Sequence, residues 1–222
     1  MIIGTGLIAN SLRNIDTNEI VYFASGVSNS LETKEAEFKR EFSLLSNVLE
    51  NNKDKKIIYF STLSVQDQSK QNSHYVLHKL EMENYIKDNS DNYLILRIGN
   101  IVGKGGNPNT LFNFLKTKIK DNGKFILHRN ARRLLLDIDD ISNFLDSTCR
   151  PIKNETINFA YPYYYNLKEI ISAIEEKINK KAVYDEEDEG DFYKVLFDDS
   201  TDTFFSGIQS DDYLRILTEK YI

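Results

Sequence analysis

Apolar runs of strand length alternate with segments of helical period along most of this chain of 222 residues. The strand-length runs lie at residues 1–3, 20–24, 57–60 and 93–98. The helical segments that follow them begin at residue 7 or span residues 33–51, 75–87 and 110–121. Parallel strands need a crossover connection, usually a helix, so this alternation predicts βαβ units and a parallel sheet.

The remaining elements extend the pattern and then depart from it. A short strand is expected at residues 134–136, a helix at 139–149 and a last sheet strand at 156–160. Residues 161–222 predict helices at 167–179 and near 211–221, with an acidic stretch at 185–189 between them. A contiguous charge run without ligand spacing is typical of a solvated loop, so we assign this stretch no function.

The composition favours a protein that binds or converts small molecules. The chain has 34 acidic and 28 basic residues and a formal net charge of -6, so it lacks the excess of basic residues that is typical of nucleic-acid-binding proteins. No apolar run approaches the length of a membrane span, so we expect no membrane partner. Three histidines are too few to predict a zinc cluster, and we predict no metal site.

The single cysteine and the first residues of the sequence indicate the cellular compartment. Cys149 has no second cysteine to pair with, so no disulfide forms within the chain, which fits a reducing compartment. The first residues lack the basic segment that precedes the apolar part of a signal peptide. We therefore expect a cytoplasmic protein whose fold begins at residue 1.

Two glycines stand where the first strand gives way to a helix. Gly4 and Gly6 fit the pattern that brings backbone N–H groups and a helix N-terminus up to a pyrophosphate. That helix would begin at Leu7 and Ile8. The acid that normally binds the adenosine ribose, about 20 residues further on, is absent, because residues 24–26 are Ala-Ser-Gly. On the other interpretation, the glycines make only a tight turn.

Tyr75 and Lys79 are four residues apart in a predicted helix and therefore share one of its faces. The Lys79 charge can favour the Tyr75 phenolate, which makes the pair a candidate acid–base catalyst. Thr62 follows a buried strand, at the sheet edge where ligands gather, and its hydroxyl would complete the site. By spacing alone, the pair fits a chance arrangement on a helix surface equally well.

Several motifs occur in one order along the chain. They are the glycine turn at residues 4–9, the segment at 24–26, Ser-Thr-Leu-Ser-Val at 61–65, the Tyr75–Lys79 pair, and the segments at 96–103 and 133–140. Together they resemble the extended short-chain dehydrogenase/reductase family, the NAD-dependent epimerases and dehydratases that modify nucleotide sugars. Two positions depart from the glycine turn, because Ile3 stands where the first glycine usually lies and Ala9 replaces the last.

This resemblance implies a role for each candidate residue. The catalytic residues would be Thr62, Tyr75 and Lys79. The cofactor, NAD or NADP, would be bound by Gly4, Gly6, Leu7, Ile8, Ala24, Ser25, Gly26, Tyr75 and Lys79. The nucleotide-sugar substrate would be bound by Thr62, Asn100 and Arg133, the last two at its diphosphate.

The resemblance also implies a Rossmann-like parallel sheet with helices on both faces and a small substrate-side α/β region. The nucleotide-binding core would comprise residues 1–102 and 134–160, and the smaller region residues 103–133 and 161–222. Family members often pair through the helices expected here at 33–51 and 75–87, which makes a homodimer a reasonable expectation.

One departure from the family is large. If residues 20–24 form its fourth strand, the second and third strands are missing, so the sheet is shortened at one edge and the adenosine site is cut short. Crossovers are right-handed in about 98% of cases. The first helix should therefore switch to the other sheet face, or residues 20–24 should occupy the second-strand position. The dinucleotide could bind through its pyrophosphate and nicotinamide alone, a neighbouring subunit could cover the adenine, or cofactor binding could be lost.

The function implied is an NAD(P)-dependent epimerase or 4-keto reductase of a nucleotide-linked sugar. Family dehydratases normally carry a pair of acids beside the catalytic hydroxyl, and Leu63-Ser64 offers none. The main alternative is a nucleotide-sugar binding protein of the same fold that has lost dinucleotide binding and redox chemistry. A reductase of other small carbonyl compounds is a third possibility.

Overall fold

A computed structural model describes residues 1–27, 29–148, 151–190 and 192–222 of the chain. Its main sheet has five parallel strands in the order β1-β2-β3-β4-β9. These strands are β1 (Ile2–Ile3), β2 (Ile20–Phe23), β3 (Lys56–Thr62), β4 (Tyr93–Ile98) and β9 (Glu155–Phe159). The predicted α/β fold with a parallel sheet is confirmed, and β1 forms one edge of the sheet.

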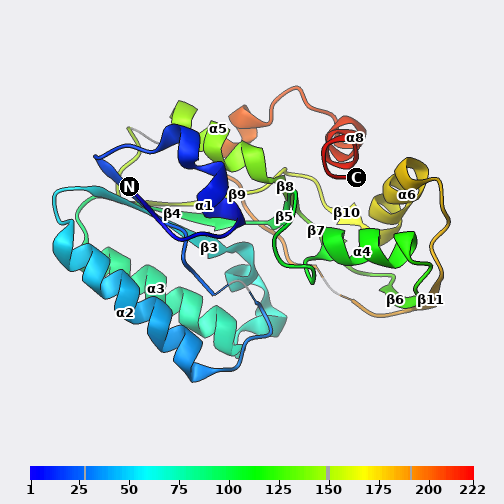
Figure 1. Cartoon of the computed structure of the whole chain (residues 1–222), viewed down its shortest axis with the longest axis horizontal. Helices are drawn as coiled ribbons and strands as arrows, with labels where there is room; N and C mark the ends of the chain where they lie inside the picture. The colour runs from blue at the N-terminus through cyan, green and yellow to red at the C-terminus, as the bar shows by residue number, and fades with distance from the viewer. Residues whose placement is uncertain (28, 149–150, 191) are drawn as a thin grey trace.

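Helices cover both faces of this sheet (Figure 1). One face carries α2 (Glu35–Asn51) and α3 (His74–Asn89), and the other carries α1 (Leu7–Ser11) and α5 (Ile138–Thr148). Alternate strand side chains are buried against the two layers: Val21, Phe23, Ile57 and Tyr59 on the α2–α3 side, Ile20, Tyr22, Ile58 and Phe60 on the α1–α5 side. Burial on both faces explains why the strands are continuous apolar runs. Cys149, the expected end of α5, lies outside the described residues.

A second group of elements lies to the right of the sheet in Figure 1. Its helices are α4 (Leu111–Lys120), α6 (Leu167–Ile178) and α8 (Ser210–Tyr221), while the short α7 (Asp199–Phe204) contacts β9 of the main sheet. Its strands are β5 (Asn100–Val102), β6 (Phe125–His128), β7 (Arg132–Arg133), β8 (Leu135–Asp137), β10 (Tyr165–Asn166) and β11 (Tyr184–Glu187). They form the pairs β5–β8 and β6–β11, which are parallel, and β7–β10, which is antiparallel. Of these short strands, the sequence predicts only β8.

The acidic stretch at 185–189 is not wholly a loop, so that expectation is wrong. Its first three residues belong to β11, which pairs with β6. Asp185 lies 2.7 Å from Lys124, and Glu186 lies 2.7 Å from Lys168. These ion pairs offset the repulsion between neighbouring carboxylates and allow the acidic segment to pair as a strand.

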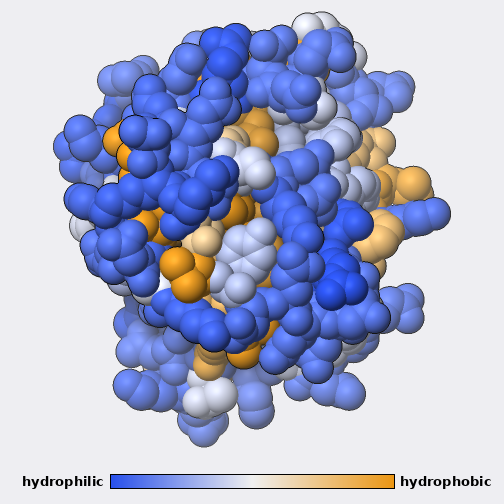
Figure 2. Space-filling view, turned by 90° about the vertical axis from the view of Figure 1, so that its right-hand side faces the viewer, coloured by the Kyte–Doolittle hydropathy of each residue, from blue (hydrophilic) through white to orange (hydrophobic). Residues whose placement is uncertain are grey.

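The outer end of the second group, turned toward the viewer in Figure 2, is predominantly hydrophilic, with apolar atoms visible in a central hollow. No helix in the described ranges combines the length and the apolar character needed to cross a membrane.

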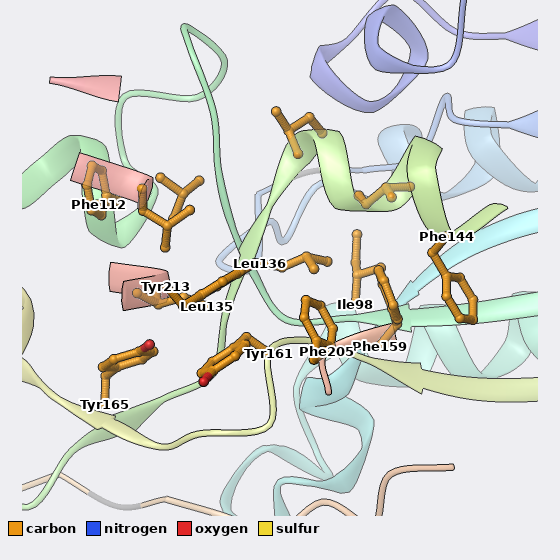
Figure 3. Packing of buried hydrophobic residues seen from close by; sticks show 14 of the residues in the cluster. Ile98, Phe112, Leu135, Leu136, Phe144, Phe159, Tyr161, Tyr165, Phe205 and Tyr213 are labelled. Carbon is orange, nitrogen blue, oxygen red and sulfur yellow. The ribbon is translucent and has the colours of Figure 1, made fainter. Parts of the chain in front are cut away.

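A single hydrophobic cluster joins the sheet to the second group (Figure 3). Phe144 of α5 stacks on Phe159 of β9, and their ring centroids are 4.2 Å apart. Tyr161 stacks on Tyr213 of α8 at 4.1 Å. Phe205 lies between these two pairs, 5.4 Å from Phe159 and 5.5 Å from Tyr161. Because aromatic contacts run without interruption from the sheet to α8, the two groups of elements share one core.

The connection from β1 to β2 has the opposite hand to the two connections that follow it. The first four strands succeed one another in one direction across the sheet, while α2 and α3 cross on one face and α1 on the other. If α2 and α3 make the right-handed crossovers found in about 98% of cases, the β1-α1-β2 connection is left-handed. Both alternatives drawn from the crossover rule are therefore wrong. The first helix has not moved to the face that carries α2 and α3, and β2 lies between β1 and β3 rather than in the second-strand position. In this arrangement α1 packs against α5, and Ala9 and Leu12 are buried.

A polar cluster holds α8 against the start of α5. The buried carboxylate of Asp137 accepts hydrogen bonds from Lys220 at 2.6 Å and from the Tyr221 hydroxyl. Asp140 accepts a hydrogen bond from the Tyr213 hydroxyl at 2.6 Å. Burial raises the pKa of Asp140 to about 6, and this effect exceeds the opposing effect of that hydrogen bond.

Replacement of Asp140 by Asn is expected to stabilise the protein at pH 8 by about 1–3 kcal/mol. The folded pKa of about 6 exceeds the ordinary value of 3.8, so the stability contributed by protonated Asp140 is complete below the ordinary pKa and is lost as the pH rises through 6. Asn keeps an acceptor for Tyr213 and does not ionise. Urea unfolding at pH 4 and pH 8 measures the gain, with Asp146→Asn on the exposed side of α5 as control. An equal gain at both pH values would contradict this assignment.

Candidate active site

Local hydrogen bonds fix the end of β3 and the start of α3. The Ser73 side chain accepts a hydrogen bond from the Val76 N–H at 3.3 Å and caps α3, which places Tyr75 in the first helical turn. Thr62, the last residue of β3, accepts a hydrogen bond from the Ser64 N–H at 3.1 Å. That contact caps a short 3₁₀ helix, η2 (Leu63–Gln66), against which α3 packs. The strand end that carries Thr62 and the helix start that carries Tyr75 therefore belong to one packed corner.

Lys79 lies on the buried face of α3 and is only 2% exposed. Its ammonium donates hydrogen bonds to Glu41 Oε1 at 2.9 Å and to the Tyr59 hydroxyl at 3.0 Å. The same Nζ atom is 5.8 Å from the centroid of the Tyr75 ring. The structure thus brings the phenol and the ammonium together, as the helix spacing predicts, but it also places a carboxylate against the ammonium.

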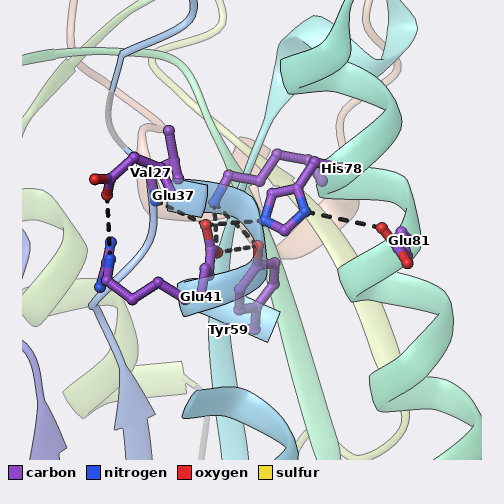
Figure 4. Close-up of polar contacts among 8 residues, drawn as sticks. Val27, Glu37, Glu41, Tyr59, His78 and Glu81 are labelled. Carbon is purple, nitrogen blue, oxygen red and sulfur yellow. Dashed lines mark hydrogen bonds and ion pairs between the residues drawn. The ribbon is translucent and has the colours of Figure 1, made fainter. Parts of the chain in front are cut away.

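The charges in this cluster are strongly coupled (Figure 4). Burial by itself would raise the pKa of Glu41, but the Lys79 charge and hydrogen bonds from His78 and Val27 lower it to about 2. Burial and the Glu41 charge raise the pKa of Tyr59 well above its ordinary range. Glu41 is therefore ionised and Tyr59 is a neutral donor at any ordinary pH.

The segment after β2 abuts the Lys79 ammonium. A Cβ atom on Gly26 would lie 2.7 Å from Lys79 Nζ, so a side chain at this position would displace the ammonium. Ala24 continues the pairing with β1, because its N–H donates to the Ile3 carbonyl at 2.8 Å. Ser25, between them, is half-buried. Among the predicted cofactor-binding residues, the structure thus brings Gly26 and Lys79 into contact.

The two glycines after β1 differ in what surrounds them. Gly4 has a φ of +132°, and a Cβ atom there would lie 2.3 Å from the carbonyl oxygen of Ala24. Gly6 caps the five-residue helix α1 without a side-chain hydrogen bond, and a Cβ atom there would meet nothing within 4 Å. Leu7 and Ile8, the first residues of α1, are half-buried against the core cluster. Gly4 serves the close approach of β1 and β2, whereas Gly6 faces open space.

Alanine substitutions are expected to separate these two roles. Gly4→Ala should destabilise the protein by at least about 2 kcal/mol, because it combines a positive φ with a backbone clash. Gly6→Ala should change stability by less than about 0.5 kcal/mol. Chemical denaturation of both variants measures the difference. Equal stabilities would mean that the turn relaxes freely around residue 4.

Asn100 and Arg133 line a cavity of about 160 Å³. Its wall also includes Ser64, Lys70, Arg132, Tyr164 and Tyr193. The Asn100 side chain donates to the Leu134 carbonyl at 3.1 Å, and burial lowers the pKa of Arg133. The structure therefore brings the two predicted diphosphate-binding residues together. Thr62, Tyr75 and Lys79 are not part of this lining, although Ser64 follows Thr62 by two residues.

Sequence reasoning missed several residues of this region. Glu41 carries a detectable signal, since it shares a helical stripe with the buried Leu45, Val48 and Leu49. A carboxylate on such a stripe needs a buried partner. Tyr164 and Tyr193 carry no comparable signal, because irregular segments bring them to the cavity.

One group of side chains away from this corner offers ligands for a metal ion. Atoms of His128, Glu187 and Glu189 lie within 4.8 Å of one another. None of the three residues is buried, and surface carboxylates gather in this way without an ion. We assign no metal to this group.

No protein-family model and no curated protein sequence matches the chain. Its fold, by contrast, matches many solved structures. UDP-glucuronic acid 4-epimerase from Bacillus cereus, solved with UDP-glucuronic acid and NAD, has a TM-score of 0.72 at 22% identity, and the match covers 97% of this chain and 76% of that one.

Two further structures have the same fold. UDP-N-acetylglucosamine 4-epimerase from Methanobrevibacter ruminantium, in complex with UDP-N-acetylmuramic acid, has a TM-score of 0.72 at 18% identity, with 98% of this chain and 80% of that one covered. UDP-glucose 4-epimerase from Thermus thermophilus, in complex with NAD, has a TM-score of 0.70 at 13% identity, with 91% and 77% covered. These likenesses establish a Rossmann-like α/β fold of the kind found in nucleotide-sugar epimerases, in a shorter chain.

Proposed function

We propose that this chain is a member of the extended short-chain dehydrogenase/reductase family and an NAD(P)-dependent epimerase or 4-keto reductase of a nucleotide-linked sugar. The observation that carries the proposal is the position of Lys79. Its ammonium lies against Gly26, in the segment after β2, and 5.8 Å from the ring of Tyr75. A phenol, an ammonium and the segment assigned to the nicotinamide side thus converge.

The residues around the glycine turn fit part of a dinucleotide. Open space at Gly6 and the absence of a side-chain cap on α1 leave room for a phosphate near backbone N–H groups. We assign the pyrophosphate to Gly4, Gly6, Leu7 and Ile8, and the nicotinamide half to Ala24, Ser25, Gly26, Tyr75 and Lys79. At the adenosine end, β1 is an edge strand, and no described strand lies beyond it to carry the ribose-binding acid that is normal there.

The proposed chemistry divides among three side chains. A bound nicotinamide would supply or accept the hydride at a sugar carbon. Tyr75 exchanges a proton with the oxygen on that carbon. Thr62 keeps its hydroxyl hydrogen for that same oxygen, because its Oγ1 accepts from the Ser64 N–H. Lys79 places its charge 5.8 Å from the centroid of the Tyr75 ring.

We assign the substrate diphosphate to the cavity at Asn100 and Arg133. The half-buried guanidinium of Arg133 suits bidentate phosphate binding. The cavity of about 160 Å³ is smaller than the roughly 300–1,000 Å³ of sites that enclose a drug-sized ligand, so it suits the diphosphate part of a nucleotide sugar. Residues 103–133 and 161–222 would form the smaller, substrate-binding region. We further propose that the protein is cytoplasmic and forms a homodimer.

A second candidate function is nucleotide-sugar binding without redox chemistry. Two observations favour it. β1 forms the sheet edge, so the strand positions beyond it are missing from the described part of the chain. In addition, Lys79 is nearly inaccessible and already bonded to Glu41, which restricts any contact with a nicotinamide ribose.

Ligand titrations decide between the two functions. Purified protein is titrated with NADH and NADPH by fluorescence and with UDP-sugars by calorimetry, and then incubated with both kinds of ligand. We expect binding of one dinucleotide and conversion of at least one nucleotide sugar. Binding of a UDP-sugar with neither dinucleotide would establish the non-redox function and overturn the first proposal.

A further inference from the structure

The carboxylate of Glu41 accepts hydrogen bonds from three different elements (Figure 4). Its Oε1 atom accepts from Lys79 Nζ at 2.9 Å and from the Tyr59 hydroxyl at 2.8 Å. Its Oε2 atom accepts from the Val27 N–H at 2.7 Å and lies 3.1 Å from His78 Nε2. With four partners and no exposed surface, this carboxylate is fully committed to the protein and has no acceptor left for a ligand.

We propose that Glu41 is a positioning residue for Lys79: it keeps the Lys79 ammonium charged and fixed between Tyr75 and the segment that contains Gly26. The inference rests on the proposed function, because the ammonium serves the chemistry assigned to Tyr75. A buried ammonium without a counter-charge tends to lose its proton. An ion pair at 2.9 Å, with hydrogen bonds to the remaining carboxylate sites, removes that tendency.

The hydrogen bonds of Glu41 do more than attach α2 to α3. Through the Val27 N–H, the same carboxylate also holds the segment after β2. Gly26 lies in that segment and would clash with Lys79 Nζ if it carried a Cβ atom. Glu41 therefore sets the ammonium and the backbone beside it in one arrangement, and neither can shift without loss of a contact.

Few other titratable groups act on this pair. Among the described residues these are Tyr59 on β3 and Tyr75 and His78 on α3, while Glu83 acts on Tyr59. Glu83 is occupied by Arg97 and Ser61, and residues 24–27 carry no charge. Within the described part of the chain, removal of the Glu41 charge therefore leaves Lys79 without a compensating carboxylate in direct contact.

The experiment compares Glu41→Gln with the unsubstituted protein, and Tyr59→Phe is the matched control. Gln preserves the shape and an acceptor for Val27 but removes the charge, whereas Phe removes the two hydrogen bonds of the Tyr59 hydroxyl, to Glu41 and from Lys79, and leaves the carboxylate in place. Protein labelled with ¹³C-lysine is titrated by NMR, and the Lys79 signal is assigned by its absence from Lys79→Arg. Turnover of the active nucleotide sugar is measured against pH in parallel.

We expect the Lys79 titration midpoint in Glu41→Gln to fall by at least about one pH unit, because its counter-charge is gone. The alkaline limb of its pH–rate profile should move to lower pH by the same amount. Tyr59→Phe should lose stability and move both midpoints by clearly less than Glu41→Gln does, because the counter-charge stays against Lys79. An unchanged midpoint in Glu41→Gln, or an equal movement in Tyr59→Phe, overturns the inference.

A second variant and the NMR measurement cover the cases in which Glu41→Gln does not fold or the protein has no turnover. If Glu41→Gln does not fold, Glu41→Asp retains the charge but draws it back by one methylene group. Its turnover should then fall at least about tenfold with the KM for the sugar unchanged, and unchanged turnover overturns the inference. The NMR comparison needs no turnover, so an inactive protein counts against the proposed function while the lysine titration still decides the role of Glu41.

Discussion

A Tyr75→Phe variant is expected to lose turnover by about 10²- to 10⁴-fold, the contribution typical of a general acid–base group. Phe keeps the ring, whose centroid lies 5.8 Å from Lys79 Nζ, and removes only the hydroxyl that exchanges the proton. Affinities for the dinucleotide and for the nucleotide sugar should therefore stay within about threefold. Steady-state kinetics with ligand titrations on the same preparation measures both quantities.

Tyr85→Phe provides the matched control on the same helix. Its hydroxyl makes a hydrogen bond of 2.8 Å with Ser46 on α2, away from Thr62 and Lys79. Loss of this phenol should cost some stability and leave turnover within about twofold. A Tyr75→Phe protein with full turnover would remove Tyr75 from its proposed role, whereas equal losses in both variants would indicate a structural effect of hydroxyl removal on α3.

The parallel sheet was predictable because its strands are buried on both faces. Such strands appear in sequence as uninterrupted apolar runs, and the run at residues 57–60 became the centre of β3. The contact between Tyr75 and Lys79 was predictable for a different reason, because residues four apart on a helix are neighbours whatever the rest of the fold. Both inferences depend only on local order along the chain.

Features that depend on distant contacts were not predictable in the same way. On its side of the sheet, α1 packs against α5, which lies more than 120 residues later in the chain. The strand pair β7–β10 has two residues on each side, too few to show a period. Glu41 lies between these cases: its place on an apolar stripe was visible, but its partner Lys79 was identified only by the fold.

The burial of Lys79 changes the interpretation of the Tyr75–Lys79 pair. From spacing alone, the ammonium was expected to favour the phenolate, and the family resemblance adds a part in binding the cofactor. In the fold it is 2% exposed and bonded to Glu41 and Tyr59, so its charge can act on Tyr75 over a short distance while direct contact with a ligand is restricted. This arrangement favours the electrostatic part of its proposed role.

The largest loss of stability is expected from Glu83→Gln, at about 2–4 kcal/mol. Glu83 is 1% exposed and accepts two hydrogen bonds from Arg97 on β4, at 2.9 and 2.6 Å, and one from Ser61 on β3, at 2.6 Å. Gln cannot satisfy all of these donors and leaves the Arg97 charge unpaired. Urea unfolding measures the loss, and Glu81→Gln is the control, because that side chain is 65% exposed and should cost less than about 0.5 kcal/mol.

A double variant identifies the cause of this loss. If the cost of Glu83→Gln comes from an unpaired charge on Arg97, then Glu83→Met combined with Arg97→Met should be more stable than Glu83→Gln, since replacement of both partners of a buried pair is often close to neutral. A double variant less stable than the single one would show that the pair itself stabilises the fold. Glu83 lies one helical turn beyond Lys79 and ties α3 to two strands, so the first outcome would mean that this ion pair fixes the position of α3 without adding net stability.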